Sequence, residues 1–183
     1  MVQYRLLKGN YIQMMKLANL SLFGGTGNMG DNYTIKKQVV LEADLNALLG
    51  KVSLDENDEM IYILPEFTDE KDIINEFAPD LNGVAKSVDI PCVMVYDKNN
   101  YEYLSSRDVE ILLPFIISLS ASACYDLMKC FVKKYFADKK RLKVRMVIKK
   151  KEDTSYRKIQ ITGDAEGVIH ALDILKDEED NGV

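Results

Sequence analysis

The fifteen residues from Ile111 to Tyr125 carry no charged side chain, and this run limits the possible folds more than any other segment. Glu110 and Asp126 bound it on either side. It is shorter than the roughly 18–20 apolar residues that cross a bilayer. We therefore expect the run to be buried in the core of a folded domain. The alternatives are that residues 111–124 form an apolar contact surface for a partner or, less favoured, that the run inserts into a membrane.

Helix signals surround this apolar run. Ser105 and Asp108 form a capping-box-like pair, which is typical of a helix N-terminus. Pro114 is expected to kink the helix, or to begin a second one at its first position. The sequence thus predicts a long central helix from Ser105 to about Phe136.

The composition is that of an ordinary globular chain. With 183 residues, 47% of them hydrophobic and 29% charged, the chain fits one domain, with a weak seam near residue 104. The three cysteines have neither disulfide nor zinc spacing, which favours a reducing, cytoplasmic location. A single histidine excludes the common histidine-rich metal sites. We predict no metal and no cofactor.

A glycine-rich motif, GTGNMG at residues 25–30, has the spacing of dinucleotide-binding loops through Gly25, Gly27 and Gly30. In those folds the third glycine leads into a helix that holds the pyrophosphate. Here residues 33–42 alternate between apolar and polar side chains and are rich in β-branched residues, which predicts a strand. The motif is therefore interpreted as a decoy, and a nucleotide-binding or small-enzyme role of loop 24–30 stays a remote alternative.

The remaining elements follow from periodicity and turn residues. We expect a short helix at 43–51, a strand at 60–65, a helix from Thr68 limited by Pro79, a hairpin over 91–104, a second hairpin formed by 141–150 and 156–163, and a closing amphipathic helix over 164–177. The predicted fold is α+β: a mainly antiparallel sheet packed on a long central helix, with a C-terminal β-β-α unit.

Positive charge is concentrated in one segment. Residues 129–158 hold 13 basic and 3 acidic residues, although the whole chain has a net charge of −5. In the strand that begins the second hairpin, the apolar residues point one way and Arg141, Lys143 and Arg145 the other, about 7 Å apart. Lys149, Lys150 and Lys151 extend the patch. Three interpretations remain open: a solvated face, a protein-binding face, or a face that contacts nucleic-acid phosphates.

Tyrosine is frequent in the chain, which has ten tyrosines and no tryptophan. Tyr96, Tyr101 and Tyr103 fall together around the predicted 91–104 hairpin. Tyrosine is enriched in interfaces, so these three are candidate binding residues. His170 projects from the closing helix opposite its apolar stripe, so we expect a surface histidine and no catalytic residue.

These patterns favour a non-enzymatic interaction or regulatory subunit of a cytoplasmic assembly, bound to a protein partner or to a second copy. The first alternative is a nucleic-acid-binding module that uses the basic strand at 139–151.

Overall fold

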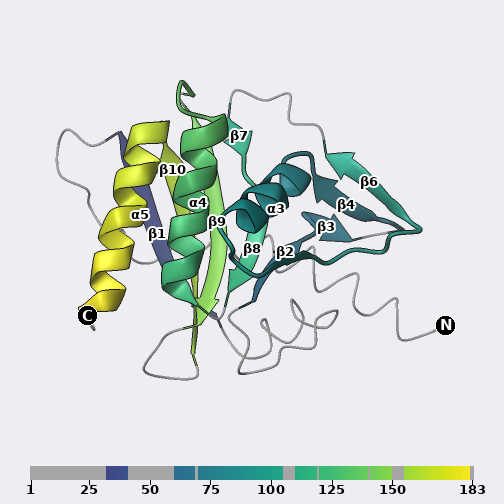
Figure 1. The fold of residues 1–183 in the computed structure, drawn as a ribbon, viewed down its shortest axis with the longest axis horizontal. Coiled ribbons are helices and arrows are strands. Elements are labelled where there is room, and N and C mark those ends of the chain that lie inside the picture. Colours follow the sequence, from purple (N-terminus) through teal and green to yellow (C-terminus); the bar gives the residue numbers. More distant parts are fainter. Residues whose placement is uncertain are drawn as a thin grey trace.

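The computed structural model describes residues 32–40, 60–68, 70–104, 110–118, 120–139, 141–149 and 155–181. In this part of the chain, ten strands form two sheets and three helices pack against them (Figure 1). The α+β class is confirmed. The predicted helix at 43–51, the glycine motif and the capping pair at Ser105 and Asp108 lie outside the described residues.

The larger sheet is mixed. Its strand order is β1-β10-β9-β8-β2-β5, and β7 also pairs with β9. The strands are β1 (Tyr33–Val40), β2 (Ile61–Leu64), β5 (Cys92–Met94), β7 (Ile111–Leu112), β8 (Phe115–Ser118), β9 (Leu142–Lys149) and β10 (Tyr156–Gly163). The pairs β1/β10, β10/β9 and β2/β8 are antiparallel, whereas β8 and β7 run parallel to β9, and β5 runs parallel to β2. The antiparallel expectation thus describes the β1-β10-β9 ladder and the β2/β8 pair but not the other pairs of the sheet.

The C-terminal β-β-α unit is present as predicted: β9 and β10 form a hairpin, and α5 (Ala165–Asp180) follows. The carboxylate of Asp164 caps α5 by accepting from the Gly167 amide at 2.7 Å. Gly163 allows β1 to approach at this point, because a Cβ there would lie 2.5 Å from the Asn32 carbonyl oxygen. The turn from β10 into α5 therefore depends on a residue without a side chain.

The long helix predicted from Ser105 to Phe136 is wrong. Residues 111–118 form β7 and β8, and the helix α4 (Ala121–Tyr135) begins only after them. Pro114 interrupts a strand and does not kink a helix. Ile116 faces one side of the sheet and Phe115 and Ile117 the other, and all three are buried. A strand buried on both faces has a continuous apolar run, which periodicity cannot distinguish from a core helix.

The helix predicted from Thr68 to Pro79 is also wrong. Thr68 ends β3 (Phe67–Thr68), residues 72–75 form β4 (Asp72–Asn75), and the helix α3 (Ala78–Ser87) begins where the prediction ended. Pro79 lies in the first turn of α3, where the missing amide hydrogen breaks no helical bond. The proline marks a helix start and not a helix end.

The predicted 91–104 hairpin separates into two sheets. β5 joins the large sheet beside β2, while β6 (Tyr101–Leu104) runs parallel to β4 in a small sheet of order β3-β4-β6. The Asn-rich turn is present, since the Asn100 amide donates to the Asp97 carbonyl at 3.1 Å. Its flanking strands pair with other strands, β5 with β2 and β6 with β4.

Helices α4 and α5 cover one face of the ladder β1-β10-β9, and α3 lies beside them (Figure 1). The main core lies between this helical layer and the sheet, and it includes the inward side chains Leu142, Val144, Met146 and Ile148 of β9, as the alternation predicted. A second, smaller apolar cluster lies on the opposite face around Tyr62, Phe115 and Val147. No helix in the described ranges has both the length and the apolar character needed to cross a membrane.

Candidate functional site

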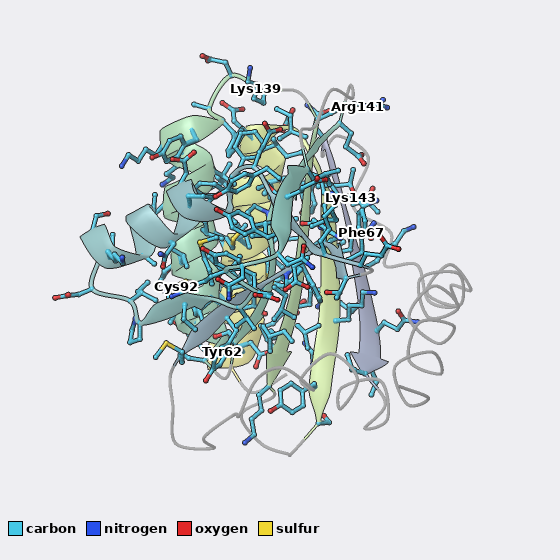
Figure 2. All side chains as sticks on the ribbon, turned by 90° about the vertical axis from the view of Figure 1, so that its right-hand side faces the viewer. Tyr62, Phe67, Cys92, Lys139, Arg141 and Lys143 are labelled. Carbon is cyan, nitrogen blue, oxygen red and sulfur yellow. The ribbon has the colours of Figure 1, made fainter. Side chains whose placement is uncertain are left out.

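The basic strand β9 places its cations on the sheet face opposite the helices, but their environments differ. Arg141, just before β9, is exposed, whereas Lys143, Arg145 and Lys149 are half-buried. Figure 2 shows Arg141 and Lys143 on the side of the ribbon away from α4. Lys150 and Lys151 lie outside the described residues. The strand therefore does not present a uniform row of solvated charges.

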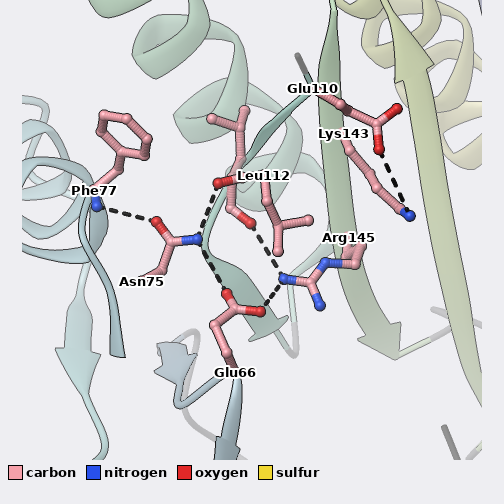
Figure 3. Close-up of polar contacts among 8 residues, drawn as sticks. Glu66, Asn75, Phe77, Glu110, Leu112, Lys143 and Arg145 are labelled. Atoms are coloured by element: carbon pink, nitrogen blue, oxygen red, sulfur yellow. Dashed lines mark hydrogen bonds and ion pairs between the residues drawn. The ribbon is translucent and has the colours of Figure 1, made fainter. Parts of the chain in front are cut away.

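Arg145 is held in a buried polar junction between the two sheets (Figure 3). Its guanidinium forms an ion pair with Glu66, which lies between β2 and β3 and is 4% exposed. The amide of Asn75, at the end of β4, donates to Glu66 Oε1 at 3.1 Å and to the Leu112 carbonyl at 2.9 Å. These bonds tie β4 of the small sheet to β7 and β9 of the large one.

A second ion pair, between Lys143 and Glu110, lies near this junction and is weaker. Lys143 Nζ lies 3.8 Å from a carboxylate oxygen of Glu110, and both side chains are about a third exposed. An exposed pair at this distance contributes little to stability. Of the predicted contact residues, Arg145 is thus a structural residue, while Arg141, Lys143 and Lys149 keep solvent-accessible charge.

The three tyrosines predicted as binding residues lie together. The ring of Tyr101 packs edge-on against Tyr96 at 4.9 Å between centroids and against Tyr103 at 5.6 Å. Tyr101 is 38% and Tyr103 50% exposed, while Tyr96 packs against the core. We call these residues the tyrosine cluster. Partial desolvation, followed by the neighbouring phenol groups of Tyr101 and Tyr96, raises the pKa of Tyr103 above its usual value.

A buried carboxylate positions the strand that carries the cluster. Asp72, which is 2% exposed, accepts from Thr68 Oγ1 at 2.7 Å and from the Asp97 amide at 2.7 Å. The side-chain amide of Asn100 donates to the Glu70 carbonyl at 2.7 Å. The turn before β6 is therefore fixed at both ends, which holds the tyrosine rings in place.

The outer edge of β6 presents backbone groups beside the cluster. The Asp72 amide donates to the Asn100 carbonyl, and the Glu76 amide donates to the Leu104 carbonyl. In a parallel ladder, every second residue of a strand directs both its amide and its carbonyl group toward the partner strand. In β6 these residues are Glu102 and Leu104, so the amide and carbonyl groups of Tyr101 and Tyr103 point away from β4. Among the described residues, no strand pairs with this edge.

Three side chains that could act as nucleophiles, those of Cys92, Ser118 and Cys124, are held in unreactive settings. Ser118 is buried, and its hydroxyl bonds to the backbone of Ser120 at 2.8 and 3.1 Å. His170 is exposed, as predicted, and its ring packs edge-on against Tyr33 at 5.7 Å between centroids. Desolvation raises the pKa of both the Cys92 and the Cys124 thiols, the first from 9.0 to about 11.

The cysteines should therefore differ in reactivity. At pH 8 we expect an aromatic disulfide reagent to label the exposed Cys130 first, because the raised pKa of Cys92 lowers its thiolate fraction about a hundredfold. The labelling rate of Cys92 should rise with pH up to about pH 11, and buried Cys124 should react only in denaturant. Peptide mapping of stopped reactions measures each rate. Equal rates for Cys92 and Cys130 in the folded protein would contradict this order.

Comparison of the chain with protein-family models, with curated proteins and with solved structures found no match.

Two residues of the junction were not singled out by sequence reasoning. Glu66 directly follows the apolar strand MIYILP, and Asn75 lies in a segment read as a helix. A charged residue between Pro65 and Phe67 was the available signal, because a carboxylate in an apolar setting needs a partner. Its partner, Arg145, is 79 residues away and no local pattern points to it.

Proposed function

We propose that this protein is a non-enzymatic interaction subunit that binds a protein partner through the tyrosine cluster. The observation that carries the proposal is the exposure of Tyr101 and Tyr103, 38% and 50%, on a strand whose outer edge has no partner among the described residues. The Tyr101 ring packs edge-on against both Tyr96 and Tyr103. Tyrosine gives large contact area and a polar hydroxyl in one side chain.

The cluster is ordered before binding, which favours affinity. Edge-on ring contacts limit the rotamers of all three side chains, and Asp72 fixes the turn that precedes them. Association then orders fewer groups, and less free energy is lost in side-chain entropy. The outward backbone groups of Tyr101 and Tyr103 suit an extended partner segment added beside β6, with the rings forming pockets for its side chains.

The test compares two tyrosine variants of the tagged protein in its native host. Tyr101→Ser/Tyr103→Ser removes the exposed rings of the cluster, and Tyr135→Ser removes a ring of similar exposure, 39%, from α4. We expect nuclease-treated affinity purification to recover a stoichiometric partner with the wild type and with Tyr135→Ser. The cluster variant should bind that purified partner at least about thirtyfold more weakly, as for the loss of about 2 kcal/mol at an interface hot spot.

The structural control is the thermal unfolding midpoint of both variants. Because the altered residues are exposed, the midpoints should stay close to that of the wild type. Equal partner affinity in the cluster variant and in the wild type would overturn the proposal, and so would the absence of any stoichiometric protein partner.

A further inference from the structure

The ladder β1-β10-β9 has a cationic face on the side away from the helices. Lys37 of β1, Ile159 of β10 and Met146 of β9 are register partners, and all three side chains lie on the helical side of the sheet. Because side chains alternate along a strand, the residues on either side of these three point to the opposite face of the sheet. We call this the open face of the ladder. Its members are Thr34, Lys36, Gln38, Val40, Lys143, Arg145, Val147, Lys149, Tyr156, Lys158, Gln160 and Thr162. Val147 and Tyr156 are buried in the second apolar cluster, so the accessible part of this face lies around the other residues.

The open face carries five cations and no acidic residue of its own. Glu66, which lies outside the ladder, forms an ion pair with Arg145, and Glu110 lies 3.8 Å from Lys143. On the other side of the sheet, α5 carries six acidic residues. A polyanion approaching the open face meets the solvent-accessible charges of Lys36, Lys143 and Lys149.

The spacing and the neutral residues suit a phosphate backbone. Neighbouring side chains on one strand face lie about 7 Å apart and adjacent strands about 4.8 Å apart, so a nucleic-acid strand that crosses the ladder can bring phosphates to both Lys36 and Lys143. Lys36 and Gln38 are exposed, and Gln160 and Thr162 are half-buried beside them. Glutamine and threonine donate hydrogen bonds to phosphate and sugar oxygens and fix the position of a strand.

An exposed aromatic ring, that of Phe67, lies at the border of this face and favours nucleic acid over an acidic protein segment as the anionic partner. Phe67 is 43% exposed and directly follows Glu66, the residue bound to Arg145. Figure 2 shows Phe67 on the same side of the ribbon as Lys143. A cationic groove combined with an aromatic ring for stacking is how proteins bind single-stranded nucleic acid, because every base has a π face. An acidic protein segment offers carboxylates but no bases to stack.

We propose that the open face, with Phe67 at its border, binds single-stranded nucleic acid, mainly through the phosphate backbone and without strong sequence preference. Charge complementarity and the exposed ring carry the proposal, which goes beyond the protein-partner function and uses a different part of the surface.

The test is fluorescence anisotropy of the full chain with a labelled, mixed-sequence RNA of about 20 nucleotides, and with the DNA of the same sequence, between about 50 and 200 mM salt. The variant Lys36→Gln/Lys143→Gln removes two cations of the open face. The matched control Lys133→Gln/Lys134→Gln removes two exposed cations of α4 on the helical side. Arg145 is left unchanged because it belongs to the buried junction.

We expect the wild type to bind with a salt dependence typical of several phosphate contacts. The open-face variant should reduce the slope of log K against log salt by about 1.4, which is about 0.7 for each lost contact. Phe67→Ala should weaken binding by about fivefold or more through lost stacking. The α4 control should match the wild type in slope and affinity.

Four results would overturn this proposal: no binding at 50 mM salt, the same loss in the α4 control as in the open-face variant, polyglutamate binding as tight as the RNA, or salt-sensitive self-association in place of RNA binding. Polyglutamate binding would indicate an acidic protein partner, and self-association a second copy. Neither result depends on Tyr101 or Tyr103, so the protein-partner proposal is tested separately.

Discussion

Arg145→Met is expected to lower the free energy of unfolding by about 3–5 kcal/mol. The substitution leaves the Glu66 carboxylate, 4% exposed, in the junction without its cation. Asn75 still donates one bond to it at 3.1 Å, but a single amide does not replace a guanidinium. A urea titration monitored by circular dichroism measures the loss of stability. Circular dichroism is chosen because the chain has no tryptophan for a fluorescence signal.

A double variant separates the lost charge balance from lost packing. In Glu66→Leu/Arg145→Met both charges are gone, and Asn75 keeps its bonds to the Leu112 carbonyl and the Phe77 amide. Because two well-packed apolar side chains often replace a buried ion pair without loss, the double variant should recover at least half of the stability lost in Arg145→Met. If the double variant is instead no more stable than Arg145→Met, the Glu66–Arg145 interaction does not hold the junction together.

Phe136→Ala is expected to destabilise the protein by about 3–5 kcal/mol, the range for truncating a buried phenylalanine. Phe136 is 3% exposed and follows the last residue of α4. Its ring lies 5.0 Å from Phe77, at the start of α3, and 5.3 Å from Phe131 on α4, both edge-on. The substitution therefore opens a cavity and removes ring contacts that join two helices.

Phe67→Ala is the matched control for this prediction, since it removes the same atoms from a ring that is 43% exposed. Its effect on the free energy of unfolding should stay within about 1 kcal/mol, because little apolar surface returns to water. A loss in Phe136→Ala no larger than in Phe67→Ala would show that the three-ring contact contributes no stability of its own.

Errors in the predicted fold arose where segments are buried on both sides or bounded by proline. Residues 111–118 were assigned to a helix because a continuous apolar run has no period, and only their pairing with β9 and β2 decides between the two structures. Pro79 was read as a helix end because proline is common at both boundaries of helices. In the 91–104 segment the turn was predicted but not the partners of its strands, since pairing between distant strands leaves no local signal.

The tyrosines show how much of the candidate site was available from sequence. Their short spacing along the chain grouped them around a predicted hairpin that does not form, and the structure instead brings Tyr101 into contact with both Tyr96 and Tyr103. Their exposure, and the outward backbone groups beside them, depend on β6 lying at the edge of the small sheet. Sequence patterns indicate what a residue can offer a partner, but strand order determines whether it is accessible.

The sequence by itself determined those elements whose two faces differ. β1, β9, β10 and α5 each have an apolar side and a polar side, so alternation or helical periodicity assigns both the element and its orientation. The tertiary structure alone decided the strand order, the split of the apolar run into β7, β8 and α4, and the pairing of Arg145 with Glu66. The physical reason is that burial on both faces removes the local pattern, and a buried charge is balanced by a partner that chain folding, not sequence spacing, brings to it.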